Sequence, residues 1–194
     1  MLDNLKHFDI FLASQSPRRQ ELLKMAGVSF HVEVVPNVPE DFPVSMAAQQ
    51  VPELLAHNKM KAYEHLWSLP HTLVITSDTI VVLDGQVINK PANREEAVVM
   101  LSNLSGMVHE VITGVVIKSA EKEVSFNDVT KVWFRELSEA DIIYYVDTYK
   151  PFDKAGSYGI QEWIGLTGIR KIDGSYFNVM GLPIDKLFHE LTQF

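Results

Sequence analysis

The chain has 194 residues, which is enough for one sizeable hydrophobic core or two small lobes. Hydrophobic residues make up 46% and charged residues 22%, as is typical of a folded globular protein. There is no cysteine, so disulfides, thiolate catalysis and thiolate metal sites are excluded. The formal net charge of -8 disfavours non-specific binding to nucleic acid or to anionic membranes.

The first segments in chain order predict a strand followed by a helix. A buried strand is predicted over residues 8–13, and the body of a helix over 20–26. Ser16 is placed to cap this helix, Pro17 suits its first position and Gly27 can end it. The strand therefore leads through a short Ser/Pro/Arg turn directly into the helix.

The next segments continue this alternation. Residues 28–35 alternate like a second strand and lead into a proline-rich loop. A long helix is predicted from Ser45 to about Trp67, in which Pro52 either makes a kink or marks the true start. The nearly uniform apolar run over 73–83 predicts a buried strand whose one charge is Asp78.

The second half of the chain is also mixed. Strands or extended segments are predicted over 87–88, 109–118, 129–137, 169–173 and 175–180, and helices over 94–103, 141–149 and after Gly181-Leu182-Pro183. The pair Ser138 and Asp141 has the spacing of a capping signal for the second of these helices. The segment 151–162 is loop-like. Interleaved strands and helices of this kind are typical of the mixed α/β class.

Two arginines lie where a free helix disfavours them. Arg18 and Arg19 occupy the first turn of the predicted helix, at the positive end of its dipole. A strand followed by a Ser-x-Ser-Pro turn presents backbone N–H groups, hydroxyls and guanidinium groups to one point, which suits a phosphate. The alternative, that the arginines point into solvent or pair with acids, remains open from this stretch alone.

Asp78 is a lone carboxylate in an apolar strand, where it needs a partner, hydrogen bonds or a metal. Either it is a structural acid satisfied by neighbouring donors such as Ser77 and Thr79, or it marks the mouth of a functional site. The sequence leaves both interpretations open.

The other polar residues of interest are not distinctive by themselves. Glu40, Lys59, Lys90 and Lys154 are each expected to be solvated surface charges when considered singly, and Gln161 lies in a predicted loop. The seven histidines show no metal-ligand spacing, and there is no GxSxG elbow, Walker loop or GxGxxG segment after a strand.

Taken together, several segments carry a more specific signal. In chain order they are LASQSPRRQELL, VPED, LAHNKMKA, SDTIVVLDGQVINKP, EEAVVMLSNLSGMVHEVITGV, DKAGSYGIQ and GSYFNVMGLP. This ordered set resembles the Maf family of nucleoside triphosphate pyrophosphatases over nearly the whole chain.

The resemblance implies a single domain over residues 1–194. Its fold would be a two-lobed α/β arrangement, with an elongated mixed sheet flanked by helices and a central cleft, similar to inosine triphosphate pyrophosphatases. The family hydrolyses nucleoside triphosphates between the α- and β-phosphates with a divalent cation, Mg²⁺ or Mn²⁺, in house-cleaning of nucleotide pools. A cytoplasmic enzyme acting on a small molecule is expected, without nucleic-acid or membrane partners, and homodimerisation is an expectation from the family alone.

The resemblance also assigns roles to individual residues. Asp78 is implied as the proton acceptor, with Lys59 and Lys90 as further catalytic residues and with Glu40 and Asp78 as metal ligands. The implied substrate-binding and specificity residues are Ser14, Arg18, Arg19, Thr79 and Gln161.

The segment DKAGSYGIQ resembles the dTTP/UTP branch of the family. The Gln161 amide offers a donor and an acceptor, which suit the O4 and N3–H edge of uracil or thymine. The following segment, EWIGLTGIRKID, departs from the more usual glycine-rich version. An alternative function is a nucleotide-binding regulatory module affecting cell division, which would tolerate Asp78→Asn and release no pyrophosphate.

Overall fold

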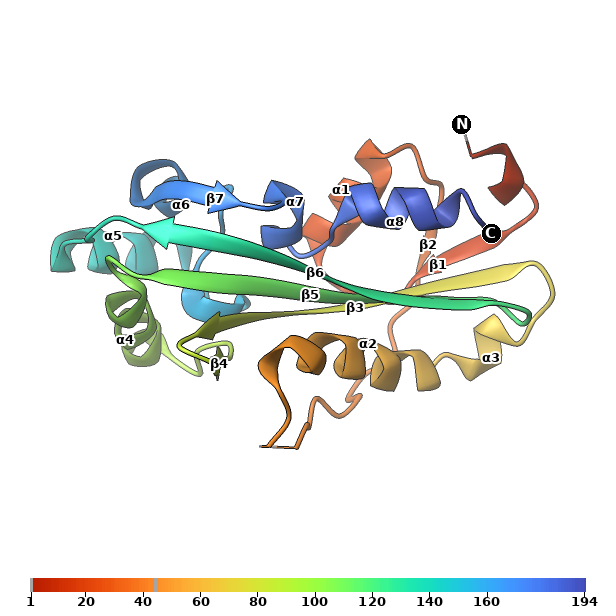
Figure 1. Cartoon of the computed structure of the whole chain (residues 1–194), viewed down its shortest axis with the longest axis horizontal. Coiled ribbons are helices and arrows are strands. Elements are labelled where there is room, and N and C mark those ends of the chain that lie inside the picture. Colours follow the sequence, from red (N-terminus) through yellow and green to blue (C-terminus); the bar gives the residue numbers. More distant parts are fainter. Residues whose placement is uncertain (1, 44) are drawn as a thin grey trace. The chain divides into compact units, whose positions relative to one another are not determined.

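The computed structural model describes residues 2–43 and 45–194. Within these residues, seven strands form one mixed sheet in the order β2-β1-β3-β5-β6-β7, with β4 paired to β3, and helices flank the strands (Figure 1). The predicted mixed α/β class is therefore confirmed. The chain divides into two compact units. Three strands contribute residues to both units: β3 (Thr72–Leu83), β5 (Val108–Lys118) and β6 (Glu123–Phe134).

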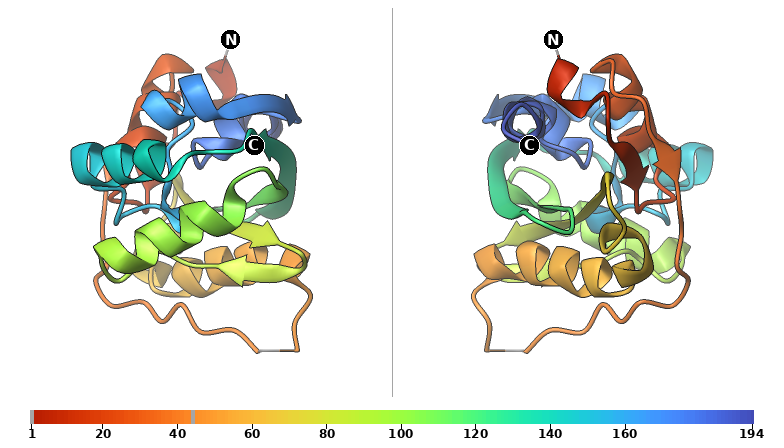
Figure 2. Two further views of the ribbon diagram at one scale, coloured as in Figure 1. Left: turned by 90° about the vertical axis from the view of Figure 1, so that its left-hand side faces the viewer. Right: turned by 90° about the vertical axis from the view of Figure 1, so that its right-hand side faces the viewer.

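The first unit comprises the described residues up to Asp78 together with Thr113–Asp128 and Gly181–Phe194. Its complete strands and α-helices are β1 (Asp9–Leu12), α1 (Pro17–Met25), β2 (His31–Val32), α2 (Val51–Lys61), α3 (Glu64–Trp67) and α8 (Ile184–Leu191). β1 pairs in parallel with β2 and with the first part of β3 (Thr72–Leu83). In this unit α1 and α8 lie on one side of the strands and α2 on the other (Figures 1 and 2).

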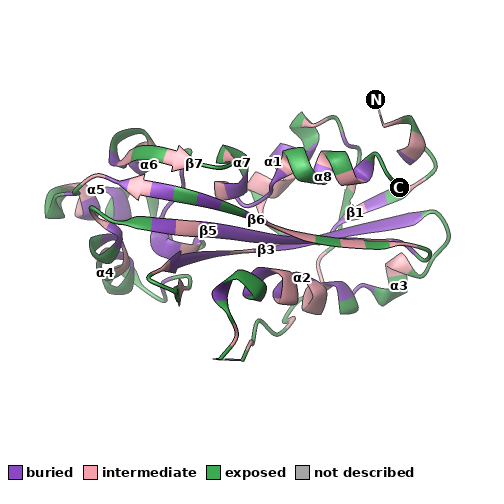
Figure 3. Ribbon diagram, in the orientation of Figure 1, coloured by how far each residue is buried: buried purple, intermediate pink, exposed green. Residues whose placement is uncertain are grey.

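One part of the core of the first unit lies between α2 and the strands. Ala56 and Met60 of α2 pack with Val74 of β3 and Val116 of β5, and all four are buried. Gly114 on β5 (Val108–Lys118) allows this close packing, because a Cβ there would overlap the backbone of Pro52 and Glu53 at the start of α2. Figure 3 shows β3 and β5 as largely buried.

Two predictions for this unit need correction. The strand predicted over 28–35 is reduced to the two residues of β2. The hydroxyl of Tyr63 accepts from Val35 N at 2.8 Å and donates to Glu33 O at 3.2 Å, so a side chain, and not a neighbouring strand, satisfies these backbone groups.

The long helix predicted from Ser45 to Trp67 is also shorter and divided. α2 begins at Val51 with Pro52 in its first turn, so the second interpretation of Pro52 is confirmed. A 3₁₀ turn, Ala48–Gln50, precedes it. The helix ends at Lys61, where Ala62 N and Tyr63 N bond to carbonyls three residues earlier, and α3 follows separately.

The second unit comprises Thr79–Ile112 and Val129–Met180. Its complete elements are β4 (Gln86–Ile88), α4 (Arg94–Leu104), α5 (Glu139–Tyr149), α6 (Trp163–Gly168), β7 (Ile169–Asp173) and α7 (Tyr176–Val179). β4 pairs antiparallel with the second part of β3, and β7 with the second part of β6 (Glu123–Phe134). The predicted β5–β6 hairpin is confirmed by their adjacency in the sheet.

The core of the second unit is built from α4, α5 and the strands beside them. Leu101 and Leu104 of α4 pack with Tyr145 and Val146 of α5, and α4 and α5 are in contact. The predicted cap at the start of α5 is a complete capping box, in which the Ser138 hydroxyl accepts from the Asp141 backbone N–H at 3.1 Å and the reverse bond is also present.

The segment predicted as extended over 175–180 is instead helical. The Ser175 hydroxyl accepts from Asn178 N and begins α7. The buried Asn178 amide then donates to Val111 O and to Thr130 Oγ1, each at 3.0 Å. These long-range bonds fix a helical turn, although aromatic and branched residues favour a strand.

The short helix α6 was not predicted. One of its two glycines, Gly165, allows the helix backbone to lie directly against the carbonyl of Ile160, since a Cβ at this position would overlap that oxygen. Within the described part of the chain, no helix combines the length and apolar character needed to cross a membrane.

Candidate active site

A lysine between two carboxylates forms the centre of the candidate site. Asp78 on β3 is buried, and its Oδ1 accepts from the ammonium of Lys59, which projects from α2. The same Nζ lies 2.9 Å from Oε1 of Glu40, in the loop before α2. The side chains of Asp78 and Lys59 are 12% and 18% exposed, against 51% for Glu40. Three segments distant in sequence thus converge on one ammonium group.

This arrangement shows how the carboxylate in the apolar strand is satisfied. The expectation that Ser77 supplies a donor to Asp78 is wrong, since the buried Ser77 hydroxyl has no hydrogen-bond partner within residues 2–43 and 45–194. Successive side chains on a strand point to opposite faces, so Ser77 and Asp78 face different layers. The partner comes from α2, and the sequence expectation that Lys59 is a solvated surface charge is also wrong.

Arg19 ties the start of α1 to the rest of the first unit. Its Nε donates to Gly181 O at 2.8 Å, and NH1 donates to Ser77 O at 2.9 Å and to Ser14 Oγ at 3.4 Å. Burial lowers the pKa of the Arg19 guanidinium, and the negative charge of Asp78 opposes this shift. An arginine in the first helical turn is therefore stabilised by carbonyl oxygens of neighbouring segments, which outweigh the unfavourable helix dipole.

The turn before α1 is organised by Ser14. Its buried hydroxyl accepts from Ser16 N at 3.2 Å as well as from Arg19. Ser16 occupies the N-cap position without a side-chain cap bond, so the predicted cap by its hydroxyl is wrong, whereas Pro17 is in the first turn as predicted. Arg18, half-buried, follows Pro17 in this same turn.

The donor set of the first unit suits a hard divalent cation. Glu40 Oε1 and Asp78 Oδ1 both lie at the Lys59 ammonium, so the two carboxylates converge. Among the described residues, no group of three or more His, Asp or Glu could hold a metal ion. Mg²⁺ is commonly bound by one or two carboxylates, with water and substrate phosphates completing its shell, so two converging carboxylates fit such an ion.

The second unit carries the remaining predicted residues. Thr79 follows Asp78 on β3 and is half-buried, and Lys90 is exposed in the loop after β4. Asn89 O accepts from Gly156 N at 3.2 Å, which joins the Lys90 loop to the loop that leads to Gln161. Gln161 is exposed in the turn before α6.

Sequence reasoning missed a buried ionic group beside Gln161. Lys154 was expected to be a solvated surface charge, but it is 9% exposed and lies 3.2 Å from Glu162 Oε1 and 2.8 Å from Asp153 Oδ1. The hydroxyl of Tyr145 donates to Glu162 Oε2. The sequence signal was confined to the DKAGSYGIQ segment, since nothing in the residue pattern connects it to Tyr145 on α5.

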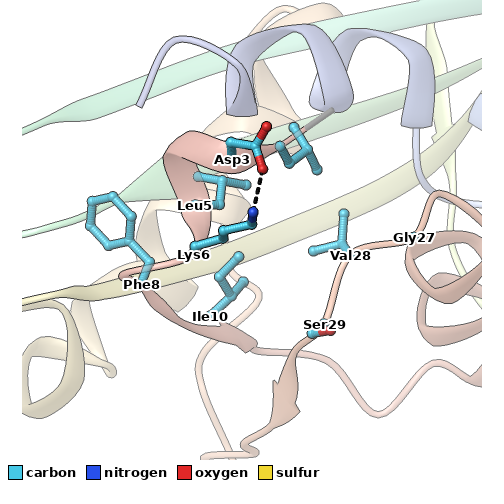
Figure 4. A pocket seen from close by; sticks show the side chains of 9 residues that line it. Asp3, Leu5, Lys6, Phe8, Ile10, Gly27, Val28 and Ser29 are labelled. Atoms are coloured by element: carbon cyan, nitrogen blue, oxygen red, sulfur yellow. Dashed lines mark ion pairs between the residues drawn. The ribbon is translucent and has the colours of Figure 1, made fainter.

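A separate pocket of about 400 Å³ lies in the first unit beside the N-terminal segment (Figure 4). Leu5, Phe8, Ile10 and Val28 supply apolar lining, and an ion pair between Asp3 and Lys6 lies at the pocket. None of the predicted site residues lines it. This pocket therefore does not contribute to the candidate active site.

Comparisons with known proteins first define a fold class. The chain is similar to the solved structure of a HAM1 protein from Coxiella burnetii, with a TM-score of 0.50 and 12% identity, over 96% of this chain and 100% of that one. This likeness places the mixed sheet and its helices among HAM1-type folds.

Sequence comparison is more specific. Residues 9–194 match the family model described as Maf-like protein, and the chain belongs to this family. It is 51% identical over 193 residues to a relative from Phocaeicola vulgatus and 50% identical over 193 residues to one from Bacteroides thetaiotaomicron. Each alignment covers 100% of both chains, and each relative is named dTTP/UTP pyrophosphatase. The resemblance identified from the sequence is confirmed.

Proposed function

We propose that this protein hydrolyses nucleoside triphosphates, dTTP and UTP in particular, to the nucleoside monophosphate and pyrophosphate. Its full-length relatives at about half identity are named for this activity. The structural observation that carries the proposal is the buried Asp78 carboxylate, held by Lys59 beside Glu40 and in the same unit as the Ser14–Arg19 turn. A carboxylate base, cations and phosphate-binding donors are the groups that this reaction needs.

In the proposed mechanism, Asp78 orients a water molecule and accepts its proton as the water oxygen attacks the α-phosphorus. A new oxygen–phosphorus bond forms, the bond between the α-phosphorus and the bridging oxygen breaks, and pyrophosphate leaves. The Lys59 ammonium fixes the position of the carboxylate. Positioning and charge stabilisation supply most of the catalysis in phosphoryl transfer, so a rigidly held base is an advantage.

A divalent cation, Mg²⁺ or Mn²⁺, would be held by Glu40 and Asp78, where it would neutralise phosphate charge and polarise a phosphoryl oxygen. Arg18, Ser14 and Lys90 would contact the phosphates, because guanidinium, hydroxyl and ammonium donors all suit phosphate oxygens. For Arg19, phosphate binding would be added to its role in holding α1.

Thr79 and Gln161, with Arg18, would recognise the nucleotide, and Gln161 would pair with the O4 and N3–H edge of uracil or thymine. We also infer that residues 1–194 act as one domain, since the family match runs through both compact units.

The test is a panel of nucleotides. The purified protein is incubated with Mg²⁺ or Mn²⁺ and dTTP, UTP, CTP, dATP, GTP or 7-methyl-GTP, and pyrophosphate and monophosphate are measured. We expect release from dTTP and UTP that disappears in Asp78→Asn. Preference for 7-methyl-GTP would contradict the assignment of Gln161. A folded protein that turns over none of the nucleotides would contradict the activity and favour a regulatory binding role.

A further inference from the structure

The turn that carries Gln161 is held more firmly than an ordinary surface turn. Glu162 N donates to Gly159 O at 3.0 Å, which closes a turn with Ile160 and Gln161 at its centre. Gly159 and Ile160 are buried, and Gln161 is exposed. The backbone of α6 lies against the Ile160 carbonyl at Gly165. The exposed amide of Gln161 is therefore mounted on an anchored piece of backbone.

One hydroxyl contacts both ends of this turn. Tyr145, which is buried on α5, accepts from Gly159 N at 3.0 Å and donates to the Glu162 carboxylate. Burial and the neighbouring Glu162 charge raise the pKa of the Tyr145 hydroxyl, so it stays protonated and keeps its donor role. A Cβ on Gly159 would lie only 2.8 Å from Cδ of Glu162, so the carboxylate is packed directly against the turn.

The charge on Glu162 is matched by a buried cation. Lys154 lies 3.2 Å from Glu162 Oε1, and the two side chains are 9% and 18% exposed. Between Lys154 and the turn, Gly156 and Ser157 both have positive φ, at 67° and 61°. A left-handed serine stores strain, and such strain persists only where the surroundings fix the backbone. The ion pair thus joins the start of this segment, Lys154, to its end, Glu162.

We propose that Tyr145, Glu162 and Lys154 are positioning residues that orient the Gln161 amide and so set the choice of base. This inference rests on the proposed function, in which Gln161 reads the base edge. A glutamine amide discriminates uracil from cytosine only if its donor and acceptor point in a fixed order, because the two bases present opposite hydrogen-bonding groups at this edge. The network fixes the backbone position from which the Gln161 side chain extends, and so limits the orientations in which its amide can meet the base.

The test uses Tyr145→Phe, which removes only the shared hydroxyl. Tyr149→Phe is the matched control, since Tyr149 lies on the same helix, is partly exposed and stacks on Tyr145 through its ring. UTP and CTP share their sugar and phosphates, so the ratio of their kcat/KM values isolates base recognition. We expect Tyr145→Phe to lower this ratio about five- to tenfold, through KM for UTP, as for loss of one orienting hydrogen bond. Tyr149→Phe should leave the ratio unchanged.

Repeating the measurement in the Gln161→Ala variant separates a positioning role of Tyr145 from a general loss of activity. In Gln161→Ala, adding Tyr145→Phe should change the ratio no further, because the group being oriented is absent. The inference would be overturned if Tyr145→Phe lowered kcat/KM equally for UTP and CTP. It would also be overturned if Tyr145→Phe lowered the UTP/CTP ratio equally with and without Gln161→Ala. If circular dichroism shows that Tyr145→Phe does not fold, Glu162→Gln takes its place and should lower the same UTP/CTP ratio. This variant keeps the shape of the side chain and removes the charge that Lys154 neutralises.

Binding of the α,β-imido analogues of UTP and CTP distinguishes this inference from the proposed function. If the wild-type protein binds the UTP analogue but releases no pyrophosphate from UTP, the proposed hydrolysis fails, and the ratio of dissociation constants in the same variants still decides the role of Tyr145. If the wild-type protein binds both analogues equally, the positioning inference is overturned, whatever the outcome for hydrolysis.

Discussion

Lys59 and Asp78 form a direct ion pair between α2 and β3, and the same ammonium also lies 2.9 Å from the Glu40 carboxylate. The two acids depend on this lysine to different degrees, because the Asp78 side chain is 12% exposed and that of Glu40 is 51% exposed. Water can solvate the Glu40 carboxylate in place of the lysine, but it has little access to the Asp78 carboxylate. The energetic consequences of removing each partner are therefore unequal.

We expect Lys59→Met to lower the free energy of unfolding by about 3 kcal/mol, because it leaves a buried carboxylate unpaired. Asp78→Asn should cost less, since Lys59 keeps its contact with Glu40 and the amide keeps the shape of the side chain. Urea denaturation of both variants gives the comparison, with Glu40→Gln as a control expected to cost less than about 1 kcal/mol. A larger loss for Asp78→Asn than for Lys59→Met would contradict this order.

The two neighbouring arginines should differ in how much each contributes to the stability of the fold. Arg19→Lys should destabilise the fold by about 2 kcal/mol, because an ammonium cannot replace the fork that reaches both Gly181 O and Ser77 O. Arg18→Lys should change stability by less than about 0.5 kcal/mol but raise KM. Urea denaturation and steady-state kinetics on the same two variants test the division. Equal destabilisation by both substitutions would speak against it.

Buried His109 should make stability depend on pH. Burial lowers its pKa to about 4 from 6.5, its Nε2 lies 2.7 Å from the Tyr158 hydroxyl, and its Nδ1 has no partner among the described residues. The folded pKa lies below the unfolded value, so the neutral form is favoured by folding. The contribution of neutral His109 to the free energy of unfolding is complete above about pH 6.5 and declines as the pH falls toward 4.

From these values, the His109 contribution should fall by about 2 kcal/mol between pH 7 and pH 5. Urea denaturation at both pH values, on the wild-type protein and on His109→Gln, isolates it from other titrating groups. The variant should show a pH dependence that is smaller by this amount. Identical pH dependence in the two proteins would mean that folding does not lower the pKa of His109.

Removal of divalent metal should stop turnover. We expect EDTA to abolish pyrophosphate release and added Mg²⁺ or Mn²⁺ to restore it, because two carboxylates can hold such an ion beside the phosphates. In Glu40→Gln the metal concentration for half-maximal activity should rise, since one charged ligand is lost. Full activity in EDTA would exclude a role for the metal.

Much of the fold could be predicted from local signals. The apolar run that forms β3, the Pro17 start and Gly27 end of α1, and the Ser138–Asp141 capping box depend on residues close in sequence. The errors occur where distant groups decide. The Tyr63 hydroxyl replaces strand pairing after β2, and bonds from Asn178 to Val111 and Thr130 fix a helical turn. Such contacts leave no periodic pattern in the chain.

The sequence by itself determined the family and the residue types of the candidate site, because its distinctive segments keep their order along nearly the whole chain. Only the tertiary structure decided what those residues contact. It brought Lys59 of α2 to Asp78 of β3, committed Arg19 to carbonyl oxygens, and buried Lys154 beside Glu162. A buried charge requires a partner, but which partner it has depends on how helices and strands pack.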